Sequence, residues 1–439
     1  MVPKGLTEMN GNRLGRRFWI SMLVFGLMGQ IAWVVENMYF NVFIYNMFHA
    51  SASDISAMVM ASAVVAALTT LIMGAVSDKI GRRKAFMSVG YMLWGASIIV
   101  FAYIRSVMLT IVMDCVMTFF GSTANDAAYN AWLTDRGDST NRGLIEGMNS
   151  MMPLVSVLVV FGGFMSFDLG VQSSWTTIYY IIGIATFLIG LAGIFLIEDS
   201  KTLKKSEYSM TKTLTYSFRP SVVTQNPVLY VVLGLFAVFG ISIQIFMPYI
   251  IIYYEKTLGI SNYVLIMGPS IILASVVTAL YGRVYDKKGF LFGMRPVIIM
   301  LMSGYVILFF SKSIIPVAIG SLLGFSGYLT GMSVFGAMIR DNIPENKAGQ
   351  FQGVRIIGQV FVPGLIGPAI GAAVLKNAQI IVNNDGTTSF LPNRSIWAAA
   401  FAVIVLLSFL MVPVSKMIER RKSAKEAACY RPLRAYSFF

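Results

Sequence analysis

The chain has 439 residues, of which 56% are hydrophobic and only 12% are charged, and its formal net charge is +14. A soluble protein of this length needs more charge to cover its surface, so the composition excludes an ordinary soluble domain. In such an apolar chain, basic residues orient helices in a membrane and contact anionic lipid, so we expect no nucleic-acid partner. Two cysteines and one histidine provide no metal or haem spacing, so we expect no metal and no cofactor.

Apolar runs recur along the whole chain, and each is long enough to cross a hydrocarbon core of roughly 30 Å as a helix. In lipid, runs of this length satisfy their backbone groups only as helices. The expected spans are 18–46, 54–76, 85–104, 107–132, 148–168, 175–197, 228–253, 263–284, 295–311, 314–338, 352–375 and 396–415. The predicted fold class is therefore an all-α membrane protein with twelve transmembrane helices.

Basic residues are distributed unequally between the connections. If the N-terminus is cytoplasmic, the segments on the inner side hold 28 of the 34 lysines and arginines. Because basic loops stay on the cytoplasmic side of a membrane, we expect a multi-pass protein of the cell membrane with both termini in the cytoplasm.

A turn containing glycine and aspartate occurs twice. GAVSDKIG at Gly74–Gly81 aligns with GRVYDKKG at Gly282–Gly289 at an offset of 208 residues, and RGLIEG aligns with AGQFQG at an offset of 206. Two motifs at nearly one offset indicate two six-helix bundles in parallel topology, each a pseudo-symmetric copy of the other. The expected parts are an N-terminal bundle 1–197, a cytoplasmic linker 198–227, a C-terminal bundle 228–415 and a basic cytoplasmic tail 416–439.

The first copy of the turn continues as GAVSDKIGRRK. Gly74 would allow close helix approach, and Gly81 would permit a tight reversal of the chain. Asp78 is placed to meet the positive N-terminal end of a helix or an arginine. Arg82 and Arg83 are expected to stay among the lipid headgroups.

This turn resembles the loop signature of the major facilitator superfamily, G-x-x-x-D-[RK]-x-G-R-[RK]. The twelve spans, the second copy and the long central loop extend the resemblance over essentially the whole chain. It implies the two-bundle fold, a central cavity, alternating access and a monomer. It also implies a set of conformational-switch residues, namely Gly74, Asp78, Gly81, Arg82, Arg83 and, in the second copy, Asp286.

A later stretch, RDNIPENKAGQFQG followed by VPGLIGPAIG, is similar to that of the sugar-cation (glycoside-pentoside-hexuronide) symporters. Those symporters carry aspartates for sodium and sugar in their second helix. Here the second helix reads ISAMVMASAVVAALTTLIMGAVSD over residues 55–78, with no acid before Asp78. The cation site of that branch is therefore not carried over to this chain.

Two spans are unusually polar. In the first, residues at spacings of three or four form a slowly drifting face, and they are Gln30, Trp33, Asn37, Asn41 and Tyr45, with Glu36 beside them. In the fourth span, a second stripe comprises Asp114, Thr118, Ser122, Asn125 and Tyr129. A polar stripe is costly against lipid, so both are expected to face the interior.

Glu36 and Asp114 lie at similar depths, about 15 Å and about 10 Å from the outer ends of their helices at 1.5 Å per residue. Two carboxyls at similar depth predict a proton or sodium coupling site, because occupancy by an ion can favour one access state. The alternative is that each carboxyl is a structural hydrogen-bonding group. Asp126 lies nearer the cytoplasm and is expected to have a structural role beside Arg136.

Amides, carboxylates and aromatic faces are the groups that bind sugars, and they recur on the helices expected to line the cavity. Trp33 is the expected stacking residue, with helix-helix packing as the alternative. The predicted substrate-binding set is Trp33, Asn37, Asn41, Asn125, Tyr129, Gln244, Tyr249, Tyr328 and Gln359.

These features predict a secondary active transporter that moves a small polar solute, a sugar or glycoside, by alternating access coupled to a proton or cation. No G-x-x-x-x-G-K-[ST] motif is present, so we expect neither ATP drive nor an enzyme. One alternative is a proton-coupled exporter of amphipathic compounds, which Met- and Phe-rich walls would suit. Another is a lipid-handling or non-transporting scaffold or receptor, against which the paired carboxyls stand. The expected partners are the solute and membrane lipids.

Overall fold

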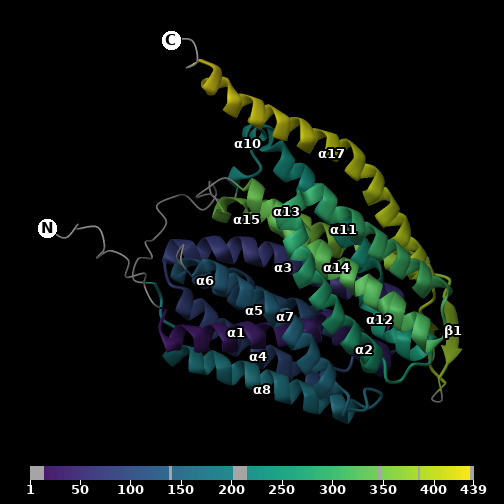
Figure 1. The fold of residues 1–439 in the computed structure, drawn as a ribbon. Coiled ribbons are helices and arrows are strands. Elements are labelled where there is room, and N and C mark those ends of the chain that lie inside the picture. Colours follow the sequence, from purple (N-terminus) through teal and green to yellow (C-terminus); the bar gives the residue numbers. More distant parts are fainter. Residues whose placement is uncertain (1–13, 138–140, 201–214, 344–347, 384–385, 436–439) are drawn as a thin grey trace. The chain divides into compact units, whose positions relative to one another are not determined.

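A computed structural model describes residues 14–137, 141–200, 215–343, 348–383 and 386–435 of the chain (Figure 1). Within these residues, twelve helical stretches are long and apolar enough to cross a membrane, which confirms the predicted fold class and number of spans. Several helices continue beyond the predicted limits, since polar residues extend them past their apolar centres. For example, the second span runs over Ala52–Ile80 and ends at the glycine turn.

The first half of the chain supplies six spans with short connections. Their elements are α1 (Arg16–Val34), η1 (Val35–Tyr39), α2 (Phe40–Phe48), α3 (Ala52–Ile80), α4 (Arg83–Val100), η2 (Phe101–Tyr103), α5 (Val107–Gly121), η3 (Ser122–Tyr129), α6 (Asn130–Arg136), α7 (Arg142–Phe164) and α8 (Gln172–Leu196). The start of α3 is fixed by a capping box. The Ser51 hydroxyl accepts the Asp54 N–H at 3.2 Å, and the Ser51 N–H donates to the Asp54 carboxylate at 2.9 Å.

The second half supplies the other six spans and two short strands. Its elements are α10 (Pro220–Gln225), α11 (Pro227–Phe246), η4 (Met247–Tyr249), α12 (Ile250–Ile252), η5 (Tyr253–Thr257), α13 (Val264–Phe310), α14 (Ile314–Asn342), α15 (Ala348–Ile356), η6 (Ile357–Phe361), α16 (Val362–Leu375), β1 (Gln379–Val382), β2 (Thr388–Leu391) and α17 (Ser395–Ala435). α13 holds two spans, because its helical geometry is broken at Gly289.

The two predicted turn glycines have left-handed backbones. Gly81 ends α3 with φ 69°, and Gly289 breaks α13 with φ 77°. This conformation costs little for glycine and is strained for other residues. The tight reversal predicted at Gly81 is therefore confirmed, and the matching position of the second copy has the same sign of φ.

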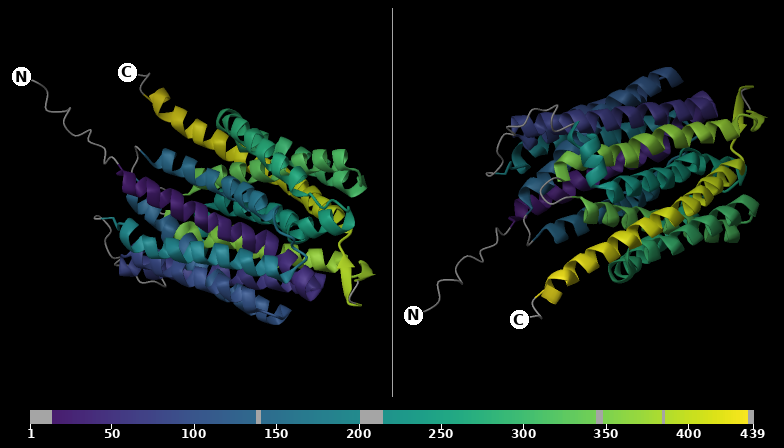
Figure 2. Two further views of the ribbon diagram at one scale, coloured as in Figure 1. Left: turned by 90° about the horizontal axis from the view of Figure 1, so that it is seen from below. Right: turned by 90° about the horizontal axis from the view of Figure 1, so that it is seen from above.

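Small residues bring α4 and α8 together. A Cβ added at Gly95 would lie 2.5 Å from the Gly183 carbonyl oxygen, and one at Gly190 would lie 2.5 Å from the Met92 nitrogen. Helices in lipid associate through such close backbone approach rather than through a hydrophobic drive. α1 packs against α7 and α8 in the same bundle, and the purple and blue helices run alongside one another in both views of Figure 2.

The described chain divides into two compact units by its internal packing. The first contains Met1–Thr215, Met247–Gly268 and Gly364–Asn393, and the second contains Tyr216–Phe246, Pro269–Pro363 and Arg394–Phe439. The first unit therefore holds six spans of the first half together with two segments of the second half. The predicted limits 1–197 and 228–415 concern the sequence repeat and stay a prediction.

A β-hairpin lies between the last two spans, where no strand was expected. β1 pairs antiparallel with β2 in a register that places Ile380 opposite Phe390 and Ile381 opposite Ser389. Gly386 has φ 80° in the connecting turn. The hairpin belongs to the first unit and contacts the end of the first span there.

Candidate functional site

Glu36 and Asp114, the predicted coupling carboxyls, are both buried within the first unit. Glu36 is the second residue of the π-helical segment η1 and is 6% exposed, whereas Asp114 lies in α5 and is 2% exposed. The two carboxyls are close enough for their charges to interact. Segments of π-helix inside α-helices are frequent at functional sites, because the inserted residue changes the direction of the side chains.

Each of these carboxyls has one oxygen with no hydrogen-bonding partner among the described residues. Thr118 Oγ1 donates to Glu36 Oε1 at 2.9 Å, which leaves Glu36 Oε2 without a partner. Asp114 Oδ1 is likewise buried and unpartnered. An ionised oxygen in this surrounding lacks both water and a donor, which is costly. The arrangement therefore has the chemistry to hold a proton or a hard monovalent cation.

Asp126 lies with these carboxyls rather than with its expected partner. It is half-buried in η3, beside Ser122, Asn125 and the indole of Trp33. It is also close enough to Glu36 for the charges of the two carboxyls to interact. Arg136 instead lies 5.9 Å from the ring centre of Phe18. Both residues are described, and no ion pair joins them. The expected role of Asp126 beside Arg136 is therefore wrong, because η3 directs the side chain towards α1.

The predicted face of the first span does not keep one environment. Trp33 is half-buried, with its ring 5.3 Å from that of Trp94, and Asn37 is exposed with its amide bonded to the Trp33 carbonyl oxygen at 2.8 Å. Asn41 is completely buried and its Oδ1 has no partner in the described chain. The extra residue of η1 turns the stripe inward between Asn37 and Asn41.

Three other predicted binding residues are buried and bonded to protein atoms. Asn125 Oδ1 accepts from Tyr91 Oη at 3.2 Å, and Tyr129 Oη donates to the Met22 carbonyl oxygen at 2.9 Å. Tyr249 Oη donates to the Ala52 carbonyl oxygen at 2.9 Å. In this conformation these side chains join helices of the first unit, so a binding role would require exchange of those bonds.

The remaining predicted residues, Gln244, Tyr328 and Gln359, are half-buried in the second unit. Gln359 Oε1 accepts from Arg355 Nε at 3.3 Å, within η6 and the end of α15. Their membership of the substrate site stays a prediction.

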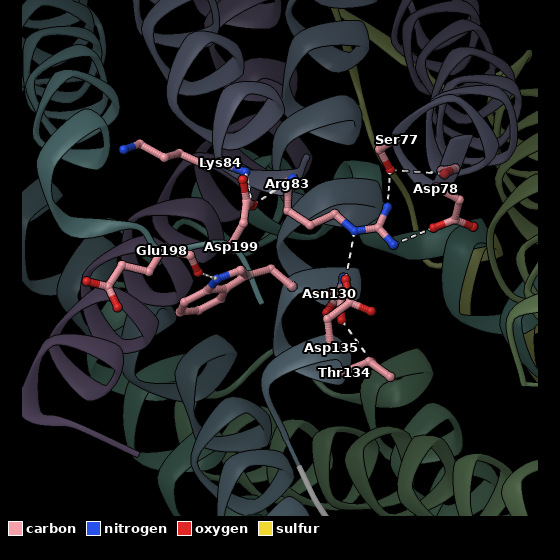
Figure 3. A network of polar contacts seen from close by, with 11 residues as sticks. Ser77, Asp78, Arg83, Lys84, Asn130, Thr134, Asp135, Glu198 and Asp199 are labelled. Carbon is pink, nitrogen blue, oxygen red and sulfur yellow. Dashed lines mark hydrogen bonds and ion pairs between the residues drawn. The ribbon is translucent and has the colours of Figure 1, made fainter. Parts of the chain in front are cut away.

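The glycine-aspartate turn is built into a polar network (Figure 3). The Arg83 guanidinium bonds to the Ser77 hydroxyl and to the Asp78 carboxylate on one side. On the other side, Arg83 Nε donates to Asp135 Oδ2 at 2.9 Å. Asp199 Oδ1 accepts the backbone N–H of Arg83 at 2.8 Å and so caps the start of α4. The Arg83 side chain therefore links the start of α4 to the end of α3 and to α6.

Two expectations about the turn, one for Arg83 and one for Gly74, differ from the structure. Arg83 is 4% exposed, so its expected place among the headgroups is wrong, whereas Arg82 is exposed. The carboxylates of Asp78 and Asp135 provide the partners that make burial of one arginine tolerable. A Cβ at Gly74 would meet no described atom within 4 Å, so the expected close approach there is not found. The Asp286 side chain lies outside the described residues.

Asp199 was not among the predicted functional residues. Its signal in the sequence is the acidic pair Glu198–Asp199 directly after the sixth span. Glu198 belongs to the same region, since its carbonyl oxygen accepts from Trp132 Nε1 at 2.8 Å and its carboxylate pairs with Arg17. Acids in an otherwise basic inner connection indicate local helix capping and pairing.

The sequence matches the family model of the Major Facilitator Superfamily over residues 18–368. The fold is similar to the solved structures of the nucleoside transporter NupG. A mutant of it has a TM-score of 0.73 at 10% identity, covering 91% of this chain and 99% of that chain. A second NupG structure has a TM-score of 0.70 at 11% identity, covering 90% and 98%. A bacterial homologue of the human lysosomal transporter Spinster, in an inward-facing and unoccupied conformation, has a TM-score of 0.70 at 14% identity, covering 92% and 98%.

Proposed function

Because the chain belongs to the Major Facilitator Superfamily, we propose that it is a secondary active transporter that moves a small polar solute by alternating access. The proposed solute class is a sugar or glycoside, and the proposed coupling ion is a proton or sodium. The proposed ion-binding groups are the carboxyls of Glu36 and Asp114.

The observation that carries this proposal is the pair of buried carboxyls with unpartnered oxygens, Glu36 Oε2 and Asp114 Oδ1. Two ionised carboxylates at such a place would repel each other and lack solvation, so the empty site is unfavourable. A proton or sodium ion removes part of that cost. Because the cost depends on whether the ion is present, its binding can favour one conformation over another, which is the requirement for coupled transport.

The proposed solute class follows from the polar groups near these carboxyls. Trp33 offers an aromatic face, Asn37 an exposed amide and Asp126 a half-buried carboxylate. Such groups suit a ring that carries hydroxyls. Nucleosides are glycosides of ribose, and NupG is a nucleoside transporter, so they belong in the same substrate screen as free sugars.

The test is uptake of radiolabelled sugars, glycosides and nucleosides into proteoliposomes under an imposed proton or sodium gradient. We expect accumulation of at least one of these solutes with the wild-type protein. Glu36→Gln and Asp114→Asn should abolish gradient-driven accumulation but retain exchange of solute across the membrane, because the carrier moves without its ion. Asp168→Asn, at an exposed carboxyl, is the matched control and should accumulate solute normally.

Full gradient-driven accumulation by both Glu36→Gln and Asp114→Asn would contradict the coupling role. A protein that accumulates no sugar, glycoside or nucleoside, yet protects cells from amphipathic drugs in a protonophore-sensitive manner, would contradict the solute class.

A further inference from the structure

Thr118 uses its hydroxyl differently from five other buried or half-buried threonines in the helices, although Thr330 likewise bonds to a side chain of another segment, Thr278 Oγ1, at 3.1 Å. Thr70, Thr110, Thr123, Thr186 and Thr278 each donate to the carbonyl oxygen four residues earlier, at 2.7 to 2.9 Å. This local bond is the usual choice for a threonine inside a helix. Thr118 is completely buried, and it donates instead to Glu36 Oε1 at 2.9 Å.

If Thr118 made the usual local bond, its acceptor would be the backbone carbonyl oxygen of Asp114. Asp114 lies four residues before Thr118 on α5, so the usual bond would return to the residue that carries the second carboxyl. Threonine in a helix divides its time between two side-chain rotamers, and one of them makes this backbone bond. Rotation about a single bond therefore exchanges one acceptor for the other.

The charge of Glu36 decides which acceptor is stronger. A hydroxyl bond to an ionised carboxylate is stronger than one to a neutral carbonyl. The titratable groups that face this carboxyl are Asp114 on α5, Asp126 on η3 and the thiol of Cys115. None of these three can be a cation, so among them no positive charge competes with the hydroxyl for Glu36.

We propose that Thr118 is a positioning residue that responds to the charge of Glu36. It donates to Glu36 Oε1 while that carboxyl is ionised, and it holds the group so that Oε2 is free for the ion. When the proton or sodium ion binds, the hydroxyl returns to the Asp114 carbonyl. Ion binding at Glu36 thereby changes a bond within α5, on which Asp114 lies. This inference rests on the proposed coupling function.

The test compares Thr118→Val, which keeps the shape and removes the hydroxyl, with Thr118→Ser, which keeps the hydroxyl. Thr110→Val is the matched control, since Thr110 lies on the same helix, is also 0% exposed and donates to the Ser106 carbonyl oxygen. Without its donor, ionised Glu36 is less stable and holds its ion more tightly. We expect the midpoint of proton-driven uptake to move to higher pH by about one unit or more in Thr118→Val. If sodium is the ion, its half-saturating concentration should fall by about tenfold or more.

Thr118→Ser and Thr110→Val should keep the wild-type profile. A second measurement is the infrared band of the protonated carboxyl, assigned by its loss in Glu36→Gln, which should shift in Thr118→Val and not in Thr110→Val. Thermal unfolding in detergent shows whether each variant is folded, and Thr118→Ala takes the place of Thr118→Val if valine is not accepted.

An unchanged profile in Thr118→Val, or an equal change in Thr110→Val, would overturn the role of Thr118 while leaving the function intact if Glu36→Gln still loses coupling. Normal coupling in Glu36→Gln is a different result, because it removes the proposed function itself.

Discussion

Arg82 and Arg83 are neighbours in the sequence with opposite surroundings. Arg83 is 4% exposed and bonds to Ser77, Asp78 and Asp135, whereas Arg82 is exposed. The repeat and the charge pattern predicted a functional role for the turn, and they predicted either a helix N-terminus or an arginine as the partner of Asp78. They did not distinguish the two arginines, since that depends on where α4 begins, and its start is capped by Asp199 from a distant part of the sequence.

Replacement of Arg83 by lysine should destabilise the protein by about 1 kcal/mol or more, because one ammonium cannot bond to Ser77, Asp78 and Asp135 at the same time. Thermal unfolding in detergent measures this, with Arg82→Lys as the control. Equal midpoints for Arg83→Lys and Arg82→Lys would show that the network does not contribute to stability.

At the scale of elements, periodicity predicted every spanning helix but none of the π-helical segments. η1 and η3 carry Glu36 and Asp126, and the extra residue in each alters which side chains share a face. A wheel drawn with 3.6 residues per turn therefore placed Asn37 and Asn41 together, although one is exposed and the other buried. The positions of such insertions depend on packing with neighbouring helices, which local spacing does not contain.

The hairpin is the second element that helical periodicity overlooked, and it is bonded to the only histidine of the chain. His49 ends α2 with φ 51°, a strained conformation for a residue other than glycine. Its ring lies 3.2 Å from Ser389 Oγ, 3.2 Å from Asn383 Nδ2 and 3.1 Å from Thr387 Oγ1. Tyr45 Oη adds a bond of 2.7 Å to the Phe390 carbonyl oxygen. These bonds attach the hairpin to the first span.

Replacement of His49 by glycine should loosen the hairpin although it relieves the backbone strain, because the ring bonds are lost. Loss of the hydrogen bonds at the two ring nitrogens, each bond contributing about 0.5 to 1.5 kcal/mol, predicts faster amide hydrogen exchange in β1 and β2, by about tenfold or more. Thr388→Ala is the control, since Thr388 is an exposed residue of β2. If exchange is as slow in His49→Gly as in the wild type, the histidine does not hold the hairpin.

At the scale of the whole molecule, composition and repeats were sufficient to predict the fold class and the family. The hydrophobic length of each span and the turn motif are local properties of the sequence. The division into two compact units could not be predicted from such local properties. Met247–Gly268 and Gly364–Asn393 come from the second half but pack within the first unit, through contacts such as Tyr249 to Ala52. Contacts of this kind depend on conformation and have no periodic signature.

The orientation of the chain in the membrane is the remaining whole-molecule prediction. Each basic residue near an anionic inner leaflet contributes about 1 kcal/mol, so 28 inner against five outer lysines and arginines should fix both termini in the cytoplasm. A membrane-impermeant maleimide tests this with the native Cys429 in the predicted tail, after Cys115 is replaced by serine. We expect Cys429 to react only in permeabilised cells. A Lys376→Cys variant without native cysteines should react in intact cells, because Lys376 is exposed just after α16 on the side where few basic residues are predicted. Reaction of Cys429 in intact cells, with protection at position 376, would reverse the orientation and place the Arg83 network on the outer side.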